Sequence, residues 1–294
     1  MFDLRYHVAS LTAVFFALVI GILVGVALAS HGLGNTERKR LERAVDDANA
    51  RAARAEEKRA ALTDEGHANS EFVKHAYNAV MEDRLEGKRV AVLFIGKVNG
   101  DVLDNINSTL ADGGAPQRLR VLAIRVPVDD AAIDGILEKR QQLATYSGKP
   151  DDLGRELADE FVLGGDTPVW DALQNQLVAE QYGNKRRPAD AVVVVRNVQP
   201  QMDGTARFLH GLYGGLSGRP IPVIGVEAST SKPSAIPVFQ HEKLWSVDDI
   251  DKKVGRVALA LLLSGAEGSY GIKQTATDGV LPEVVPISTP SAGG

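Results

Sequence analysis

Apolar and polar residues divide the chain into three parts, and the first part is a continuous apolar segment. Residues 8–29 carry no charged side chain, and 22 residues at about 1.5 Å each can cross a hydrocarbon core of about 30 Å. A secretory signal has a shorter apolar core of about 7 to 15 residues, although Ala27, Leu28 and Ala29 fit the cleavage pattern. We therefore predict a retained transmembrane helix at residues 8–29 after a short cytoplasmic segment at residues 1–7, with a cleaved signal peptide as the alternative.

Small residues recur along one side of this predicted membrane helix. Ala17, Gly21 and Gly25 are spaced by four residues, so their small side chains share one helical face. Such a face, which includes the G-x-x-x-G pattern, lets two helix backbones approach each other in a bilayer. These three residues are therefore predicted to pair two membrane helices.

The second part, residues 35–86, is polar and charged with a helical period, which predicts a coiled-coil stalk. The seam is thin because alanine buries little area and because Arg51 and Lys58 occupy the alternate core positions. A single exposed helix is the alternative, and Gly66 is expected to break or bend the helix. The apolar positions of the predicted seam recur every seven residues: Leu41, Ala48, Ala55 and Leu62.

In the third part, short apolar runs alternate with amphipathic segments, which predicts an α/β domain at residues 87–266. We expect a Rossmann-like, three-layer arrangement with a mainly parallel sheet. Residues 150–183 predict two helices without a strand, whereas residues 235–239 predict a short strand. Residues 267–294 are rich in Pro, Gly, Ser and Thr and predict a flexible C-terminal tail.

Charged residues follow four of the predicted strands and define a candidate ligand pocket. Ligands of open parallel sheets bind at the carboxyl ends of the strands, so polar residues at these points are candidates for binding an anion such as a phosphate. Neither of the glycine-rich nucleotide-binding motifs is present to support this pocket. The candidate residues are Lys97, Arg125, Arg196 and Glu227.

Composition excludes several classes of function. The formal net charge of −5 provides no basic excess for binding nucleic acid. The chain has no cysteine, which excludes disulfides, thiolate metal sites and a cysteine nucleophile. Neither G-x-S-x-G nor H-E-x-x-H occurs. We therefore expect no enzymatic activity, no catalytic residues, no metal site and no cofactor.

Three stretches of the sequence occur in a characteristic order: "FDLRYHVASLTAVFFALVIGILVG", "GKRVAVLFIG" and "GRVALALLLSGAEGSYGIKQTATDGVLP". In this arrangement the chain resembles the actinobacterial MctB family of copper transport proteins, which includes the corynebacterial cell-separation protein SteB. The resemblance implies an anchor in the plasma membrane with the C-terminal domain outside the cytoplasm, and an outer-membrane location is the alternative. The charge count alone leaves the orientation open, because Arg38, Lys39, Arg40 and Arg43 follow the span but are interleaved with acidic residues.

The resemblance implies two functions. In one, the protein is a dimeric, SteB-like scaffold for cell separation, with a cytosolic SteA-like partner near the N-terminus and the coiled coil of a cell-wall hydrolase as an outer partner. In the other, it serves copper efflux or copper tolerance. Soft Cu(I) prefers sulfur ligands, and the chain offers only Met1, Met81 and Met202. We therefore expect the scaffold function and keep copper transport as the alternative.

Overall fold

The computed structural model describes residues 4–31, 35–115 and 118–285. The chain divides into two compact units, residues 1–69 and 70–294, which are considered separately. Residues 1–3 of the predicted cytoplasmic segment, residues 1–7, lie outside the described residues. The last part of the predicted tail, residues 286–294, also lies outside them.

The first unit is helical. Helix α1 (Leu4–His31) contains an 18-residue window, Ser10–Ala27, with a mean hydropathy of 2.5 and no burial. It is the one helix among the described residues that is long and apolar enough to cross a membrane, a criterion that a signal sequence also meets. The expected N-terminal apolar helix is thus confirmed.

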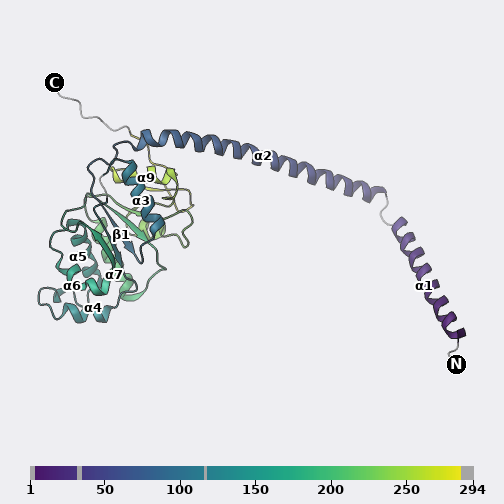
Figure 1. Cartoon of the computed structure of the whole chain (residues 1–294), viewed down its shortest axis with the longest axis horizontal. Coiled ribbons are helices and arrows are strands. Elements are labelled where there is room, and N and C mark those ends of the chain that lie inside the picture. The colour runs from purple at the N-terminus through teal and green to yellow at the C-terminus, as the bar shows by residue number, and fades with distance from the viewer. Residues whose placement is uncertain (1–3, 32–34, 116–117, 286–294) are drawn as a thin grey trace, which may run out of the picture. The chain divides into compact units, whose positions relative to one another are not determined.

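Helix α2 (Asn35–Met81) begins in the first unit and ends in the second. It continues through Gly66 without interruption, so the expected break is wrong (Figure 1). A single glycine costs about 1 kcal/mol of helix propensity, which the surrounding helix formers such as Leu62 and Glu65 offset. Pairing of α2 into a coiled coil stays a prediction.

The second unit is built on a seven-stranded sheet with the order β3-β2-β1-β4-β5-β6-β7. All neighbours are parallel except β2 and β3, which are antiparallel. The expected α/β fold with a mainly parallel sheet is therefore confirmed. Its strands are β1 (Val90–Ile95), β2 (Arg120–Ile124), β3 (Val178–Gly183), β4 (Ala191–Arg196), β5 (Val223–Val226), β6 (Trp245–Val247) and β7 (Ser269–Tyr270).

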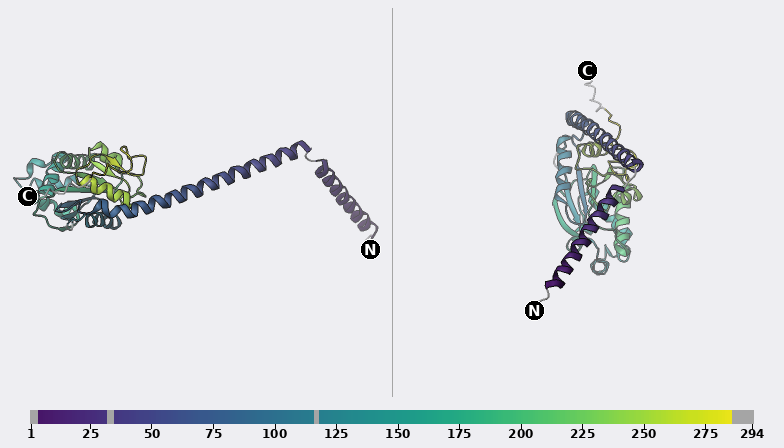
Figure 2. Two further views of the ribbon diagram at one scale, coloured as in Figure 1. Left: turned by 90° about the horizontal axis from the view of Figure 1, so that it is seen from above. Right: turned by 90° about the vertical axis from the view of Figure 1, so that its right-hand side faces the viewer.

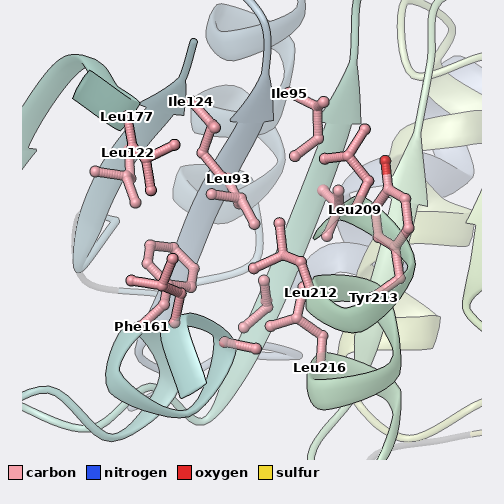
Figure 3. Close-up of a cluster of buried hydrophobic side chains, with 14 of the residues drawn as sticks. Leu93, Ile95, Leu122, Ile124, Phe161, Leu177, Leu209, Leu212, Tyr213 and Leu216 are labelled. Carbon is pink, nitrogen blue, oxygen red and sulfur yellow. The ribbon is translucent and has the colours of Figure 1, made fainter. Parts of the chain in front are cut away.

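Helices cover both faces of the sheet, which is why β1, β2, β4 and β5 are apolar on both sides (Figures 1 and 2). One core lies against α4 (Asp130–Leu137), α5 (Pro150–Leu163), α6 (Pro168–Leu177), α7 (Asp203–Ser217) and α8 (Ile236–His241). Figure 3 shows part of this core, which includes Leu93 of β1, Phe161 of α5 and Leu212 of α7. The other core lies against α3 (Gly100–Asp112), α9 (Lys253–Leu263) and the last turns of α2, from which Tyr77 and Met81 are buried.

Three local predictions are corrected. Residues 178–183 form the edge strand β3, which among the described strands pairs only with β2. Because its side chains are half-exposed and mostly polar, the sequence shows no apolar pattern of a strand there. Residues 236–241 form helix α8, which is too short to show a helical period, and the strand follows at β6. The sheet also extends into the predicted tail, because β7 pairs with β6. The 3-10 helix η1 (Ala144–Tyr146) completes the secondary structure of the described residues.

Candidate functional site

A cavity of about 490 Å³ opens at the carboxyl ends of β1 and β4. Strand β1 lies between β2 and β4, so the chain leaves β1 toward one side of the sheet and later returns on the other side. Ligands of open α/β sheets bind at such a switch point. The cavity is lined by Lys97, Val98, Asn99, Arg196, Asn197, Val198, Gln199, Pro200, Ser231, Lys232, Pro233, Ser234, Ala235 and Val238.

Among the described residues, three cationic side chains line this cavity and no acidic one does. Lys97 follows β1, Arg196 ends β4 and Lys232 lies in the loop after β5. The Arg196 guanidinium donates hydrogen bonds to the Tyr213 hydroxyl at 3.2 Å and to the Gln199 carbonyl at 3.3 Å. Within the described part of the chain, none of the three cations forms a salt bridge with a carboxylate. The cavity is therefore electropositive.

The buried carboxylate of Glu227 fixes the loop that forms one wall of the cavity. It accepts hydrogen bonds from the Ser234 hydroxyl at 2.7 Å and from the Ala235 N–H at 2.5 Å. The Lys273 ammonium lies 2.6 Å from the same carboxylate and also donates to the Ser231 carbonyl at 3.3 Å. Lys273 therefore neutralises Glu227, so the carboxylate charge does not oppose an anion in the cavity.

The structure brings together only part of the predicted pocket. Lys97 and Arg196 line the cavity as expected, whereas Glu227 is buried behind its wall. Arg125 does not reach the cavity: it donates to the Val178 carbonyl at 3.0 Å and lines a separate hollow beside β3. Lys232 was not predicted, because it stands six residues after β5 and belongs to no recognisable motif.

Three aspartates follow β6 in different surroundings. Burial and the neighbouring charges of Asp248 and Asp251 raise the pKa of Asp249 to about 7, and neither of its carboxylate oxygens has a hydrogen-bond partner in the part of the chain that the structure describes. Burial acts to raise the pKa of Asp251 as well, but hydrogen bonds from the Ser229 N–H and hydroxyl lower it to about 2. Asp248 accepts hydrogen bonds from the N–H groups of the segment after β7. The carboxylates of Asp248 and Asp251 therefore support the fold, whereas the charged form of Asp249 is disfavoured by its burial.

The described residues contain no group of three or more His, Asp or Glu side chains arranged to hold a metal ion. His210 is exposed, and its Nδ1 lies 2.9 Å from the Glu242 carboxylate. Met81 is fully buried in the core, whereas the side chain of Met202 is 77% exposed. The two methionine sulfurs among these residues therefore lie in different environments.

The residues predicted to pair helices face open space in the single chain. A Cβ added at Gly21 or Gly25 would have no described atom within 4 Å beyond its chain neighbours and the adjacent helix backbone. On α2, Leu41 is 62% exposed and Leu62 is 58% exposed, while Ala17, Ala48 and Ala55 are also exposed. Pairing through these residues stays a prediction.

Comparison with known proteins shows that the chain is similar to proteins described as copper transporters. The model of the MctB family, described as "Copper transport outer membrane protein", matches residues 1–281. The copper transporter MctB of Mycobacterium tuberculosis (strain H37Rv) is 24% identical over 314 aligned positions, which cover 92% of this chain and 96% of that protein. The copper transporter MctB of Mycobacterium bovis shows the same identity and coverage. The similarity therefore spans both units.

Proposed function

The chain belongs to the MctB family, and on that premise we propose that it takes part in copper export as a membrane-anchored, non-enzymatic protein that does not itself carry the metal. This proposal rests on the family match over residues 1–281. It is supported by the mycobacterial relatives, which are named copper transporters. Copper is the transported substrate in this proposal.

The donor chemistry of the chain favours an accessory role over a carrier role. Cu(I) prefers thiolate and thioether ligands, and the sequence holds no cysteine and three methionines. Met81 is enclosed in the core and Met202 lies at the surface. The cavity at β1 and β4 is lined by cations, which repel a metal ion. We therefore place the copper-conducting path in a partner protein.

The test is copper sensitivity of a deletion strain, with cell-associated copper measured by mass spectrometry. We expect the deletion to lower copper tolerance and to raise cell-associated copper. A variant with Met81→Leu and Met202→Leu should restore tolerance as well as the wild-type chain, because both replacements preserve side-chain volume. Normal copper tolerance of the deletion strain would contradict the copper role. If the double methionine variant were well expressed but did not restore copper tolerance, the accessory role would be contradicted.

We place α1 across the plasma membrane with the α/β domain outside the cytoplasm. The apolar window Ser10–Ala27 supports the span. Since the chain has no cysteine, a single introduced cysteine reports its location without background. Ser70→Cys, at an exposed position on α2, should react in intact cells with a membrane-impermeant maleimide, whereas Asp3→Cys should react only after lysis. The reverse pattern would contradict this topology.

A second candidate function, a dimeric scaffold for cell separation, is favoured by the exposed apolar side chains of α2. Leu41 and Leu62 leave apolar surface uncovered at a spacing that suits a helical partner. The partners in this function would be a second copy, a cytosolic SteA-like protein and the coiled coil of a cell-wall hydrolase. The deletion strain should then form chained cells without added copper, and normal separation would contradict it.

A further inference from the structure

We propose that the cavity at the carboxyl ends of β1 and β4 binds a small phosphorylated organic molecule. In this proposal the phosphate contacts Lys97, Arg196 and Lys232, and the organic part lies on the apolar side chains of the lining. This binding is separate from the copper role, because a cationic site selects an anion. The apolar surface of the cavity is formed by Val98, Val198, Pro200, Pro233 and Val238.

The charges of the cavity are available to a ligand. Lys97 and Lys232 are exposed, and no hydrogen bond from either ammonium group to another described residue is present. Arg196 is half-buried and uses two of its five N–H groups on neutral oxygens, so the remaining donors can bind an anion. Lysine and arginine bind phosphate through charge-assisted hydrogen bonds.

The backbone around the cavity adds to this positive field. Helix α3 begins at Gly100, directly after Asn99, which lines the cavity and caps the helix by accepting from the Val102 N–H at 3.1 Å. The N-terminus of a helix carries a partial positive charge that favours anions. Asp101 lies in the first turn of α3, but it does not line the cavity. The helix therefore reinforces the three cations, which define the site.

The cavity wall is held in place before any ligand binds. Glu227 anchors the loop through Ser234 and Ala235, and Lys273 neutralises the buried carboxylate. A binding loop that is already ordered loses less conformational entropy when the ligand arrives. Glu227 and Lys273 are thus positioning residues.

The size and lining of the cavity indicate the class of ligand. A volume of about 490 Å³ is within the range of about 300 to 1,000 Å³ that small-molecule sites occupy, and it exceeds what a bare phosphate ion fills. Three cations match a phosphate monoester better than a single carboxylate. The apolar side chains can cover a ring or alkyl group, so we infer a phosphate monoester with an apolar portion.

Binding can be measured by isothermal titration calorimetry on the full chain in detergent micelles, with phenyl phosphate as the probe. We expect saturable binding of phenyl phosphate, weaker binding of inorganic phosphate, and no measurable binding of benzyl alcohol. Replacing two cations, in a Lys97→Gln and Lys232→Gln variant, should weaken phenyl phosphate binding at least about tenfold. The matched control is Lys139→Gln with Lys149→Gln, which removes two exposed charges outside the cavity and should leave the Kd unchanged.

Each alternative result overturns the proposal. Absence of saturable phenyl phosphate binding to the wild-type chain would exclude this ligand class. An equal loss of phenyl phosphate affinity in the cavity variant and in the control variant would show that only the net charge of the protein matters. Binding of benzyl alcohol as tight as that of phenyl phosphate would show an apolar site without anion recognition. The substituted lysines are exposed, so we expect both variants to fold, which thermal unfolding verifies.

Discussion

The carboxylate of Glu227 lies 2.6 Å from the ammonium of Lys273, and this ion pair joins the end of β5 to the segment that follows β7. The Glu227 side chain is 2% exposed and the Lys273 side chain is 19% exposed. Lys273 also donates to the Ala228 carbonyl at 2.9 Å. One lysine from a Pro- and Gly-rich segment therefore fixes a wall of the cavity.

Replacement of Lys273 by methionine should lower the free energy of unfolding by about 3 kcal/mol, because it leaves the Glu227 carboxylate buried without its counter-ion. Urea unfolding of the full chain in micelles measures the change. Lys252→Met is the control, since the side chain of Lys252 in its pair with Asp251 is 55% exposed and should contribute little. Adding Glu227→Gln to Lys273→Met should recover part of the loss. A neutral effect of Lys273→Met would contradict the role of the ion pair.

Asp249 should make stability depend on pH. Its pKa is about 7 in the folded protein and lower when unfolded, so the folded state holds the proton more tightly and stability falls as pH rises from about 4 to about 7. Asp249→Asn should therefore stabilise the protein by about 2 to 4 kcal/mol at pH 8 relative to wild type, and by less at pH 5.

Asp251→Asn is the opposing control in the same urea titrations. The pKa of Asp251 is lowered to about 2, so its carboxylate stabilises the folded state above the unfolded pKa, and that contribution disappears as pH falls toward 2. This variant should be less stable than wild type at both pH 5 and pH 8. If Asp249→Asn changed the free energy of unfolding equally at pH 5 and pH 8, the raised pKa of Asp249 would be contradicted.

Helices α5 and α7 pack with a glycine at their contact, and an alanine there should destabilise the domain. A Cβ on Gly211 would overlap the backbone of Asp151, so Gly211→Ala should cost about 1 to 3 kcal/mol or more. Gly214 lies on the same helix and faces open space, so Gly214→Ala should be neutral or stabilise by up to about 1 kcal/mol. Thermal unfolding of the two variants compares them. Equal effects would show that the contact tolerates a methyl group.

Pairing of α1 can be tested with larger side chains at Gly21 and Gly25. Replacing both with leucine should weaken self-association in membranes, because the added side chains keep the two backbones apart. Leu23→Ala changes the opposite face of the helix and should leave association unchanged. Crosslinking or fluorescence energy transfer in lipid bilayers measures the dimer fraction. An unchanged fraction in the Gly21 and Gly25 variant would remove the pairing role.

The seam of α2 allows a matched comparison of alanine positions. Ala48→Glu with Ala55→Glu places two charges in the predicted seam and should reduce self-association or partner binding. Ala50→Glu with Ala60→Glu adds the same charges outside the seam and should have no effect. Analytical ultracentrifugation of the full chain in micelles measures self-association, and co-purification measures partner binding. Identical behaviour of the two double variants would contradict the coiled coil.

The elements that depend on local pattern were predictable from the sequence. The apolar segment at residues 8–29 and the polar helical segment from residue 35 follow from composition and period alone. The continuous apolar runs of β1 and β4 indicate strands buried on both faces, because helices must cover them. Lys97 and Arg196 were predictable as neighbours at one edge of the sheet, since they stand at the carboxyl ends of such strands, and both line the cavity.

The tertiary structure decided which residues meet. The edge strand β3 has no apolar signature, because it pairs on one side only and its side chains stay half-exposed. Lys232 and Lys273 gain their roles from loops whose course depends on the packing of β5 to β7, and no local spacing encodes that course. Strand order likewise separates Arg125 from the cavity, because the end of β2 lies beside β3 and not beside β4. Local sequence thus determined most of the elements, whereas long-range packing determined the edge strands and which residues line the cavity.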